Sequence, residues 1–196
     1  MYPIPDPEIR SYISRVLGEL SLEQLKDVLV RKLSYADRIK EKIKQLADVY
    51  AETQFMDKII TQQIVTSPEW HFPKTIVPGI TGASIGNSLY EKEGAMNSFE
   101  TSVITDIASL SNIAFWHRNL GRGKGFAING YKSNHYPDFI VVTKSGKIIL
   151  LETKGDDRDN SDSAAKCRLG AKWAELSGKD FYYFMVFDKA QTDGAY

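Results

Sequence analysis

The chain has 196 residues, of which 42% are hydrophobic and 26% are charged, and its 25 basic residues balance its 25 acidic ones. This length can bury a sizeable core, and the composition is ordinary for a soluble protein. There is no run of about 18 apolar residues that would predict a membrane span, and no secretory signal is visible. The single cysteine, Cys167, excludes an internal disulfide and a cysteine-based zinc site. We therefore expect a cytoplasmic protein.

The balanced charge is unevenly distributed along the chain. A net charge of zero counts mildly against a nucleic-acid partner, because affinity for DNA comes largely from neutralising phosphates. The segment 107–137 nevertheless carries four Arg and Lys residues and two His residues without a single acid, whereas the segment 156–162 is acidic. One part of the chain could therefore still face a polyanion.

Two short helices are predicted at the start of the sequence. Asp6 is expected to cap the first helix, with Pro7 in its first position and its end near Gly18. Ser21 and Gln24 have the spacing of a capping box and predict the start of a second helix.

A long amphipathic helix is predicted next, from about Tyr35 toward Ile64, either unbroken or with a break near Thr53. Residues 66–88 alternate proline with glycine, which favours a connector with a possible short strand at 75–77. We expect a helical accessory region over residues 1–70, a connector over 71–95 and a second domain over 96–196.

The second domain is expected to begin with a helix capped by Ser98. Glu100 lies in its first turn, and the run 113–116 after it is apolar and strand-like. The buried stripe of this helix is expected to contain Phe99, Val103, Ile107 and Leu110.

The glycine-rich loop 121–125 follows. It carries Arg122 and Lys124 and could either track a phosphate backbone or be a plain flexible hairpin loop. It lacks the spacing of a nucleotide-binding P-loop, and no other stretch has that spacing.

Two apolar runs of strand length, 139–142 and 148–151, flank a short connection and predict a β-hairpin. Gly146 can take the left-handed conformation that closes a three-residue loop. The resulting register places Thr143 opposite Lys147 and, walking outward, Asp138 opposite Glu152.

After the hairpin we expect a polar loop over residues 156–162. A helix marked by Ala165, Leu169, Trp173 and Leu176 should follow and stop at Gly178. The apolar run 181–187 predicts a strand buried on both faces. A strand, a helix and a second strand in this order predict the crossover of an α/β sheet.

The open end of the hairpin carries the most informative polar residues. Because side chains alternate along a strand, Glu152 and Lys154 share a face, and Asp138 joins them in this register. Two carboxylates held so close are costly unless a cation lies between them. Mg²⁺ suits such oxygen ligands, and a neighbouring lysine can orient or deprotonate an attacking water. The arrangement suits the cutting of a phosphodiester.

The residues Pro137-Asp138 and Glu152-Thr153-Lys154 resemble the PD-(D/E)XK nuclease signature. Over about residues 88–187 the chain also resembles the C-terminal endonuclease domain of type III restriction enzyme restriction subunits. The segments that carry this wider resemblance are Phe115-Trp116-His117-Arg118-Asn119, Gly130-Tyr131, Tyr136-Pro137-Asp138-Phe139 and Glu152-Thr153-Lys154-Gly155.

The resemblance implies an α/β fold, with a restriction-endonuclease-like core whose mixed central sheet is flanked by helices. It implies an endodeoxyribonuclease that hydrolyses DNA phosphodiester bonds with Mg²⁺, for which Mn²⁺ should substitute, and leaves 5′-phosphates. Asp138 and Glu152 would bind the metal, and Lys154 would position the water. Glu100 would either assist in binding the metal or only stabilise the N-terminus of its helix. The expected DNA contacts are His117, Arg118, Arg122, Lys124 and Lys166. For Lys166 an ordinary surface lysine is the alternative that stays open.

The same resemblance implies double-stranded DNA as a partner. It also implies a helicase motor on a longer parent chain or a partner subunit, together with a possible methyltransferase subunit. Three alternatives stay open: an ordinary hairpin with a salt bridge to Lys154, a catalytically idle nucleic-acid-binding or scaffolding domain, and another nuclease of the same fold.

Overall fold

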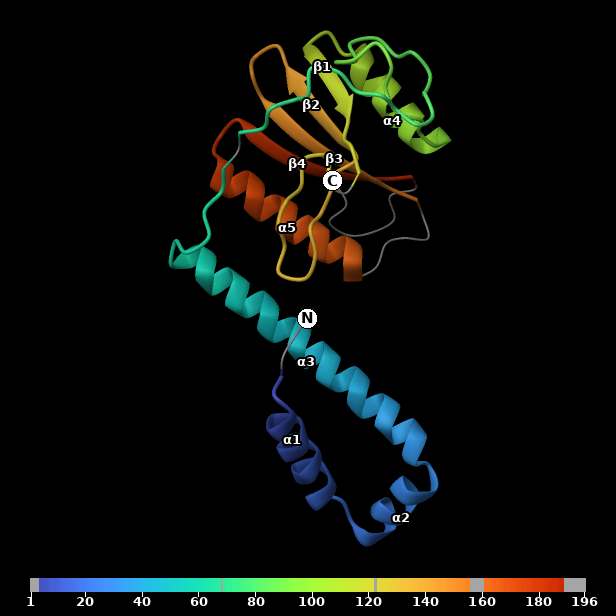
Figure 1. The fold of residues 1–196 in the computed structure, drawn as a ribbon, viewed down its shortest axis with the longest axis vertical. Helices are drawn as coiled ribbons and strands as arrows, with labels where there is room; N and C mark the ends of the chain where they lie inside the picture. Colours follow the sequence, from blue (N-terminus) through green and yellow to red (C-terminus); the bar gives the residue numbers. More distant parts are fainter. Residues whose placement is uncertain (1–3, 68, 122, 156–160, 189–196) are drawn as a thin grey trace. The chain divides into compact units, whose positions relative to one another are not determined.

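The computed structural model describes residues 4–67, 69–121, 123–155 and 161–188. Within these ranges the chain contains five α-helices and one four-stranded mixed sheet, which confirms the expected α/β class (Figure 1). The chain divides into two compact units, residues 1–64 and 65–196. The finer division into a connector over 71–95 and a domain from residue 96 stays a prediction.

The first unit holds three helices, α1 (Asp6–Gly18), α2 (Leu22–Val30) and α3 (Lys32–Ile60). The capping box at the start of α2 is confirmed, because the Gln24 amide donates to Ser21 Oγ and the Ser21 amide donates to Gln24 Oε1. The expected cap of α1 is wrong by one residue. Pro5 precedes the helix in an extended conformation, and Asp6 is already helical in the first turn.

The long helix α3 starts at Lys32, three residues before the expected position, and runs unbroken to Ile60. Thr53 does not interrupt it. The Thr53 hydroxyl donates to the Val49 carbonyl one turn earlier, at 2.9 Å, and stays within the helix. Few side chains of this unit are buried. In its helices only Ala47 and Ile59 are, among the residues that the structure describes.

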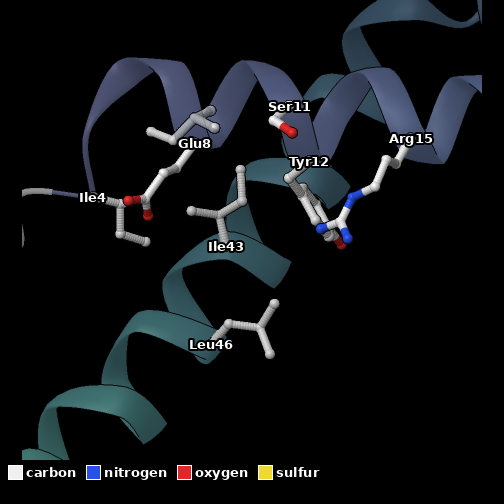
Figure 2. A pocket seen from close by; sticks show the side chains of 8 residues that line it. Ile4, Glu8, Ser11, Tyr12, Arg15, Ile43 and Leu46 are labelled. Atoms are coloured by element: carbon white, nitrogen blue, oxygen red, sulfur yellow. The ribbon is translucent and has the colours of Figure 1, made fainter.

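A groove of about 390 Å³ lies between α1 and α3 in this unit. Figure 2 shows Ile43 and Leu46 of α3 below α1, and Glu8, Tyr12 and Arg15 projecting from α1. The groove is therefore apolar on its α3 wall and carries charged side chains on its α1 wall.

The second unit is built on a sheet whose strands lie in chain order. The strands are β1 (Ile113–Arg118), β2 (Phe139–Thr143), β3 (Ile148–Lys154) and β4 (Phe181–Phe187). The pairs β1–β2 and β2–β3 are antiparallel, and β3–β4 is parallel. The short strand expected at 75–77 does not form: Pro73 and Pro78 lack amide donors, and Val77 is exposed.

The predicted hairpin and its register are confirmed. Phe139 pairs with Leu151, and the Thr143 amide donates to the Lys147 carbonyl at 2.9 Å. Gly146 has φ +85°, the left-handed conformation that the tight loop needs. Continuing this register outward brings residues 138 and 152 to the same open end of the hairpin.

The sheet has a core on each face, because successive strand residues point to opposite sides. The helix α4 (Ser98–Ser109) packs with its buried Ile104 against Trp116, Phe139 and Val141. The helix α5 (Ser161–Ser177) covers the other face, where its Trp173 packs in the second core. The buried residues of that second core are Phe126, Ile128, Ile140, Leu150 and Trp173.

The structure corrects two details of α4. Its cap is Asn97 rather than Ser98, because Asn97 Oδ1 accepts from the Glu100 amide and Glu100 Oε2 accepts from the Asn97 amide. The expected buried stripe is rotated: Ile104 and Ala108 are buried, whereas Leu110 lies beyond the helix and is exposed.

The end of α5 is confirmed, since Gly178 directly after it has φ +109°. The helix begins at Ser161, before the expected start, and residues 156–160 of the expected polar loop lie outside the described ranges. The expectation for β4 is wrong. Only Met185 of this strand is buried and Phe184 is 39% exposed, because β4 is an edge strand that pairs with β3 alone. No helix of the described ranges is long and apolar enough to cross a membrane.

Candidate functional site

The carboxylate of Asp138 is held by three contacts where the chain enters β2. Its Oδ2 accepts two hydrogen bonds from Thr153, one from the amide and one from the hydroxyl, both at 2.8 Å. Its Oδ1 lies 3.5 Å from Nη1 of Arg118. Asp138 is therefore oriented by the neighbouring strands β3 and β1 before any ligand arrives.

Glu152 lies in β3 and is only 4% exposed. Its Oε1 is 2.5 Å from Nζ of Lys154, but its Oε2 is buried with no hydrogen-bond partner among the described residues. Burial raises the pKa of Glu152, the negative charge of Asp138 raises it further, and Lys154 opposes both effects. A buried acceptor left unpaired in this way is costly, so the site has an unmet need for a donor or a cation.

A second ion pair lies on α5 beside the first. Lys166 Nζ is 2.8 Å from Asp162 Oδ2, one helical turn away. Burial lowers the pKa of Lys166, but the hydrogen bond and charge of Asp162, together with the charge of Glu152, outweigh it, and the net pKa is raised. The hydrogen bond from Lys166 lowers the pKa of Asp162. Both groups of this pair are therefore held in their charged forms.

Two further polar side chains close the α5 side of the site. His135 Nε2 is 2.9 Å from the Tyr183 hydroxyl. Burial, then the charges of Lys166 and Lys154, lowers the pKa of His135 to about 4, so its imidazole is neutral at pH 7. Burial and the charge of Glu152 raise the pKa of Tyr183. His135 and Tyr183 are thus two uncharged side chains next to the charged groups.

Glu100 reaches the site through Arg118 rather than directly. Its Oε1 is 3.2 Å from Nη2 of Arg118, and its Oε2 accepts from the Asn97 amide in the capping box of α4. Both oxygens of Glu100 are therefore engaged. The structure brings Glu100 to Arg118, and Arg118 to Asp138.

His117, expected at the rim of the site, is buried in the fold. It is 2% exposed, and its Nδ1 lies 3.0 Å and 3.2 Å from the two oxygens of the buried Glu93. The rings of Phe72 and Tyr90 meet it edge-on. This environment leaves no surface of His117 for contact with a large partner.

The remaining predicted contact residues are spread out. Arg122 lies outside the described residues. Lys124 is exposed in the loop after β1. Of the predicted set, the structure gathers Asp138, Glu152, Lys154, Arg118 and Lys166, with Glu100 behind Arg118.

Four residues that lie in this neighbourhood were not predicted as site residues from the sequence: Glu93, His135, Asp162 and Tyr183. Asp162 had a usable signal, because it lies four residues before Lys166, which is the spacing of an ion pair along a helix. Asp162 instead falls in the polar loop expected before the helix. Tyr183 had none, because it lies inside an apolar strand whose place in the sheet is set only by the fold.

The donor set fits Mg²⁺ better than other common metals. In the described part of the chain no group of three or more His, Cys, Asp and Glu side chains could hold a metal. Zinc needs such a group. Mg²⁺ is commonly held by one or two carboxylates, with water and phosphate oxygens completing its shell. Asp138 and Glu152 meet that lower requirement, and the unpartnered Glu152 Oε2 is the atom that a cation would satisfy.

A small pocket of about 60 Å³ adjoins this cluster, between the loop 130–135 and α5. His135 and Lys166 contribute to both the pocket and the cluster around Glu152. The pocket provides room beside His135 and Lys166 for one small group.

The comparisons with known proteins point to a different class from the one that the motif suggested. No protein-family model matches the chain, and no solved structure matches it. The chain is 25% identical over 193 residues to a protein named probable deoxyhypusine synthase from Thermoplasma acidophilum. The match covers 92% of this chain, and this chain spans 61% of the length of that relative.

This similarity corrects the functional expectations drawn from the motif. Three predictions are wrong: that the chain is a PD-(D/E)XK nuclease, that it is part of a type III restriction subunit, and that it is an endodeoxyribonuclease. The reason is that the relative carries the name of an enzyme with another reaction. The nuclease and restriction-modification descriptions are withdrawn with them. The alternative of a scaffold in a helicase assembly is withdrawn as well. The resemblance to the restriction subunits rested on four short segments within about residues 88–187, whereas this similarity covers 92% of the chain.

Proposed function

We propose that this chain binds a divalent cation, Mg²⁺ with Mn²⁺ as its substitute, through Asp138 and Glu152, and uses it to hold a phosphate-bearing ligand. The observation that carries the proposal is the buried Oε2 of Glu152, which has no partner among the described residues and lies beside a second carboxylate. A cation would satisfy that atom and relieve the repulsion between the two acids.

The choice of ligand rests on the cations around the carboxylates. Lys154 and Lys166 present two ammonium groups on the same side of the sheet as Glu152. Bound Mg²⁺ keeps open positions that phosphate oxygens commonly fill, and it neutralises part of their charge. In the proposal Asp138 and Glu152 hold the cation, while Lys154 and Lys166 face the ligand's remaining charge.

Calorimetric titration with Mn²⁺ and with Mg²⁺ tests the proposal. We expect saturable binding to the intact chain and at least a tenfold weaker affinity in Glu152→Gln and in Asp138→Asn, since each loses one anionic ligand. Glu175→Gln is the matched control, because Glu175 is an exposed acid on α5 whose partner is Lys172. Equal affinity in all four proteins would refute the proposal.

The ligand arm of the experiment uses inorganic phosphate as the probe. We expect phosphate to bind in the presence of Mg²⁺ and much more weakly in its absence, and Lys166→Gln to weaken binding in both conditions. Equal affinity for phosphate with and without Mg²⁺ would show that the cation does not hold the phosphate.

A second candidate function is favoured by the comparison alone. The similarity to the probable deoxyhypusine synthase covers 92% of this chain, which supports the activity printed in that name. The test is an assay of deoxyhypusine formation by this chain, run beside the relative as the positive control. Product above background would favour this candidate, and its absence would count against it.

We also propose a more specific fold class and a cellular location. The order helix, strand, hairpin, helix, strand, with β4 parallel to β3, supports a restriction-endonuclease-like core, as a fold without its activity. The single cysteine supports a cytoplasmic location. Double-stranded DNA, the motor and the methyltransferase subunit stay predictions.

A further inference from the structure

Arg118 occupies the space between two carboxylates of the candidate site. Its Nη2 lies 3.2 Å from Glu100 Oε1, and its Nη1 lies 3.5 Å from Asp138 Oδ1. Its guanidinium carbon lies 5.2 Å from the centre of the Phe139 ring, within cation–π range. The side chain is only 21% exposed. Arg118 is thus engaged inside the protein.

The two contacts of Arg118 are unequal. Glu100 is the nearer carboxylate, and it is itself fixed by its capping bond to Asn97 at the start of α4. The contact with Asp138 is at the outer limit of a hydrogen bond, while Asp138 has two firmer bonds from Thr153. The weaker contact is the one that can be exchanged without moving either strand.

We infer that Arg118 is the resident counter-ion of Asp138 and sets the affinity of the Asp138–Glu152 pair for a divalent cation. Without a bound cation, the guanidinium neutralises Asp138. When a cation occupies the pair, Arg118 gives up the 3.5 Å contact and stays on Glu100. This inference rests on the proposed function, and it assigns Arg118 and Glu100 a regulating role in place of direct contact with ligand or metal.

The physical basis is the competition of like charges for one carboxylate. A guanidinium close to Asp138 lowers the attraction of that carboxylate for a second cation, by an amount that grows as the site becomes less exposed to water. Glu100 works in the opposite direction, because it draws the guanidinium away from Asp138. Removing Arg118 and removing the charge of Glu100 should therefore shift cation affinity in opposite directions.

The experiment is Mn²⁺ calorimetry on the full chain with two variants. We expect Arg118→Gln to bind Mn²⁺ about tenfold more tightly than the unmodified chain, and Glu100→Gln to bind it several-fold more weakly. Glutamine at position 100 retains the acceptor that the capping box uses. A merely structural role for Arg118 would weaken binding in both variants, so the opposite signs are diagnostic.

Arg118→Lys is the conservative control, and it should restore the weaker affinity of the unmodified chain because it restores the positive charge. Weaker or unchanged Mn²⁺ binding in Arg118→Gln, with the unmodified chain still binding, would overturn the inference and leave the proposed function standing. Absence of Mn²⁺ binding by the unmodified chain would overturn both. If Arg118→Gln does not fold, the Mn²⁺ affinity of Glu100→Gln tests the inference: weaker binding supports it, and unchanged or tighter binding overturns it.

Discussion

At the scale of single residues, the site is organised as paired opposite charges. Asp138 faces Arg118, Glu152 faces Lys154 and Asp162 faces Lys166. Such pairing explains how a chain of zero net charge can gather so many ionised groups in one place. Against this background Glu152 Oε2 is the exception, since it is buried without a partner in the described part of the protein.

The buried His135 predicts a specific dependence of stability on pH. Its pKa in the folded chain is about 4, against an ordinary 6.5, because burial and then Lys166 and Lys154 disfavour the imidazolium. Between these two values the unfolded chain binds more protons than the folded chain, so stability falls as pH falls from 6.5 to 4. The lowered pKa of His135 corresponds to a loss of about 3 kcal/mol in the free energy of unfolding at the acid end of this pH range.

The measurement is urea unfolding of the intact chain and of His135→Gln at pH 7 and at pH 4.5. The loss of stability on acidification should be smaller in His135→Gln, and the difference isolates His135 from the carboxylates that titrate in the same range. His71→Gln is the matched control, because His71 is exposed. The same acid-induced loss in all three proteins would contradict the assignment.

At the scale of elements, the start of α4 links helix stability to the site. Asn97 caps the helix and also donates its amide to Glu100, which in turn holds Arg118. Helix capping and site geometry therefore depend on the same few atoms. The sequence placed this cap one residue too late.

We expect Asn97→Ala to reduce the free energy of unfolding by about 1 kcal/mol, the usual loss when a capping side chain is removed. Ser98→Ala should have almost no effect, because Ser98 is the first helical residue and makes no capping bond. Urea denaturation of the two variants compares them directly. A larger loss in Ser98→Ala than in Asn97→Ala would restore the sequence-based position of the cap.

The sequence predicts the elements with local signals and misses what depends on their packing. The hairpin and its register follow from Gly146 and two short apolar runs, and the end of α5 follows from Gly178. The exposure of Phe184 could not be predicted, because an apolar run does not reveal whether its strand is central or at an edge. The proximity of Lys166 to Glu152 also depends on where α5 crosses the sheet.

Among the site residues, too, local signals were predictive and contacts between distant segments were not. Asp138, Glu152 and Lys154 come together through alternation and hairpin register, both of which are local. His117 was misplaced, because its burial against Glu93 depends on a loop that precedes β1 by about 20 residues. Charge pairs formed across distant segments leave no periodic signal in a sequence.

At the scale of the whole molecule, the candidate site belongs to one of the two compact units. All of its residues lie in the unit 65–196, which also contains both cores of the sheet. The helical unit 1–64 buries few side chains in its own helices within the described ranges. The two units should therefore differ in how well they persist alone.

We expect the fragment 65–196 to fold and to bind Mn²⁺ with the affinity of the full chain, because it keeps every proposed ligand and its supports. The fragment 1–64 should unfold at lower temperature, since burial of apolar surface is the main stabilising term. Circular dichroism melts and Mn²⁺ titration of the two fragments provide the comparison. A fragment 65–196 that folds but binds no Mn²⁺ would show that residues of the first unit are needed.

In the proposed site, Asp138 and Glu152 together hold one divalent cation. The most direct measurement is the anomalous scattering of a crystal of the full chain soaked in Mn²⁺. We expect a single strong peak within about 2.5 Å of both carboxylates, and no such peak in Glu152→Gln. A peak elsewhere on the protein, with none between these two side chains, would contradict it.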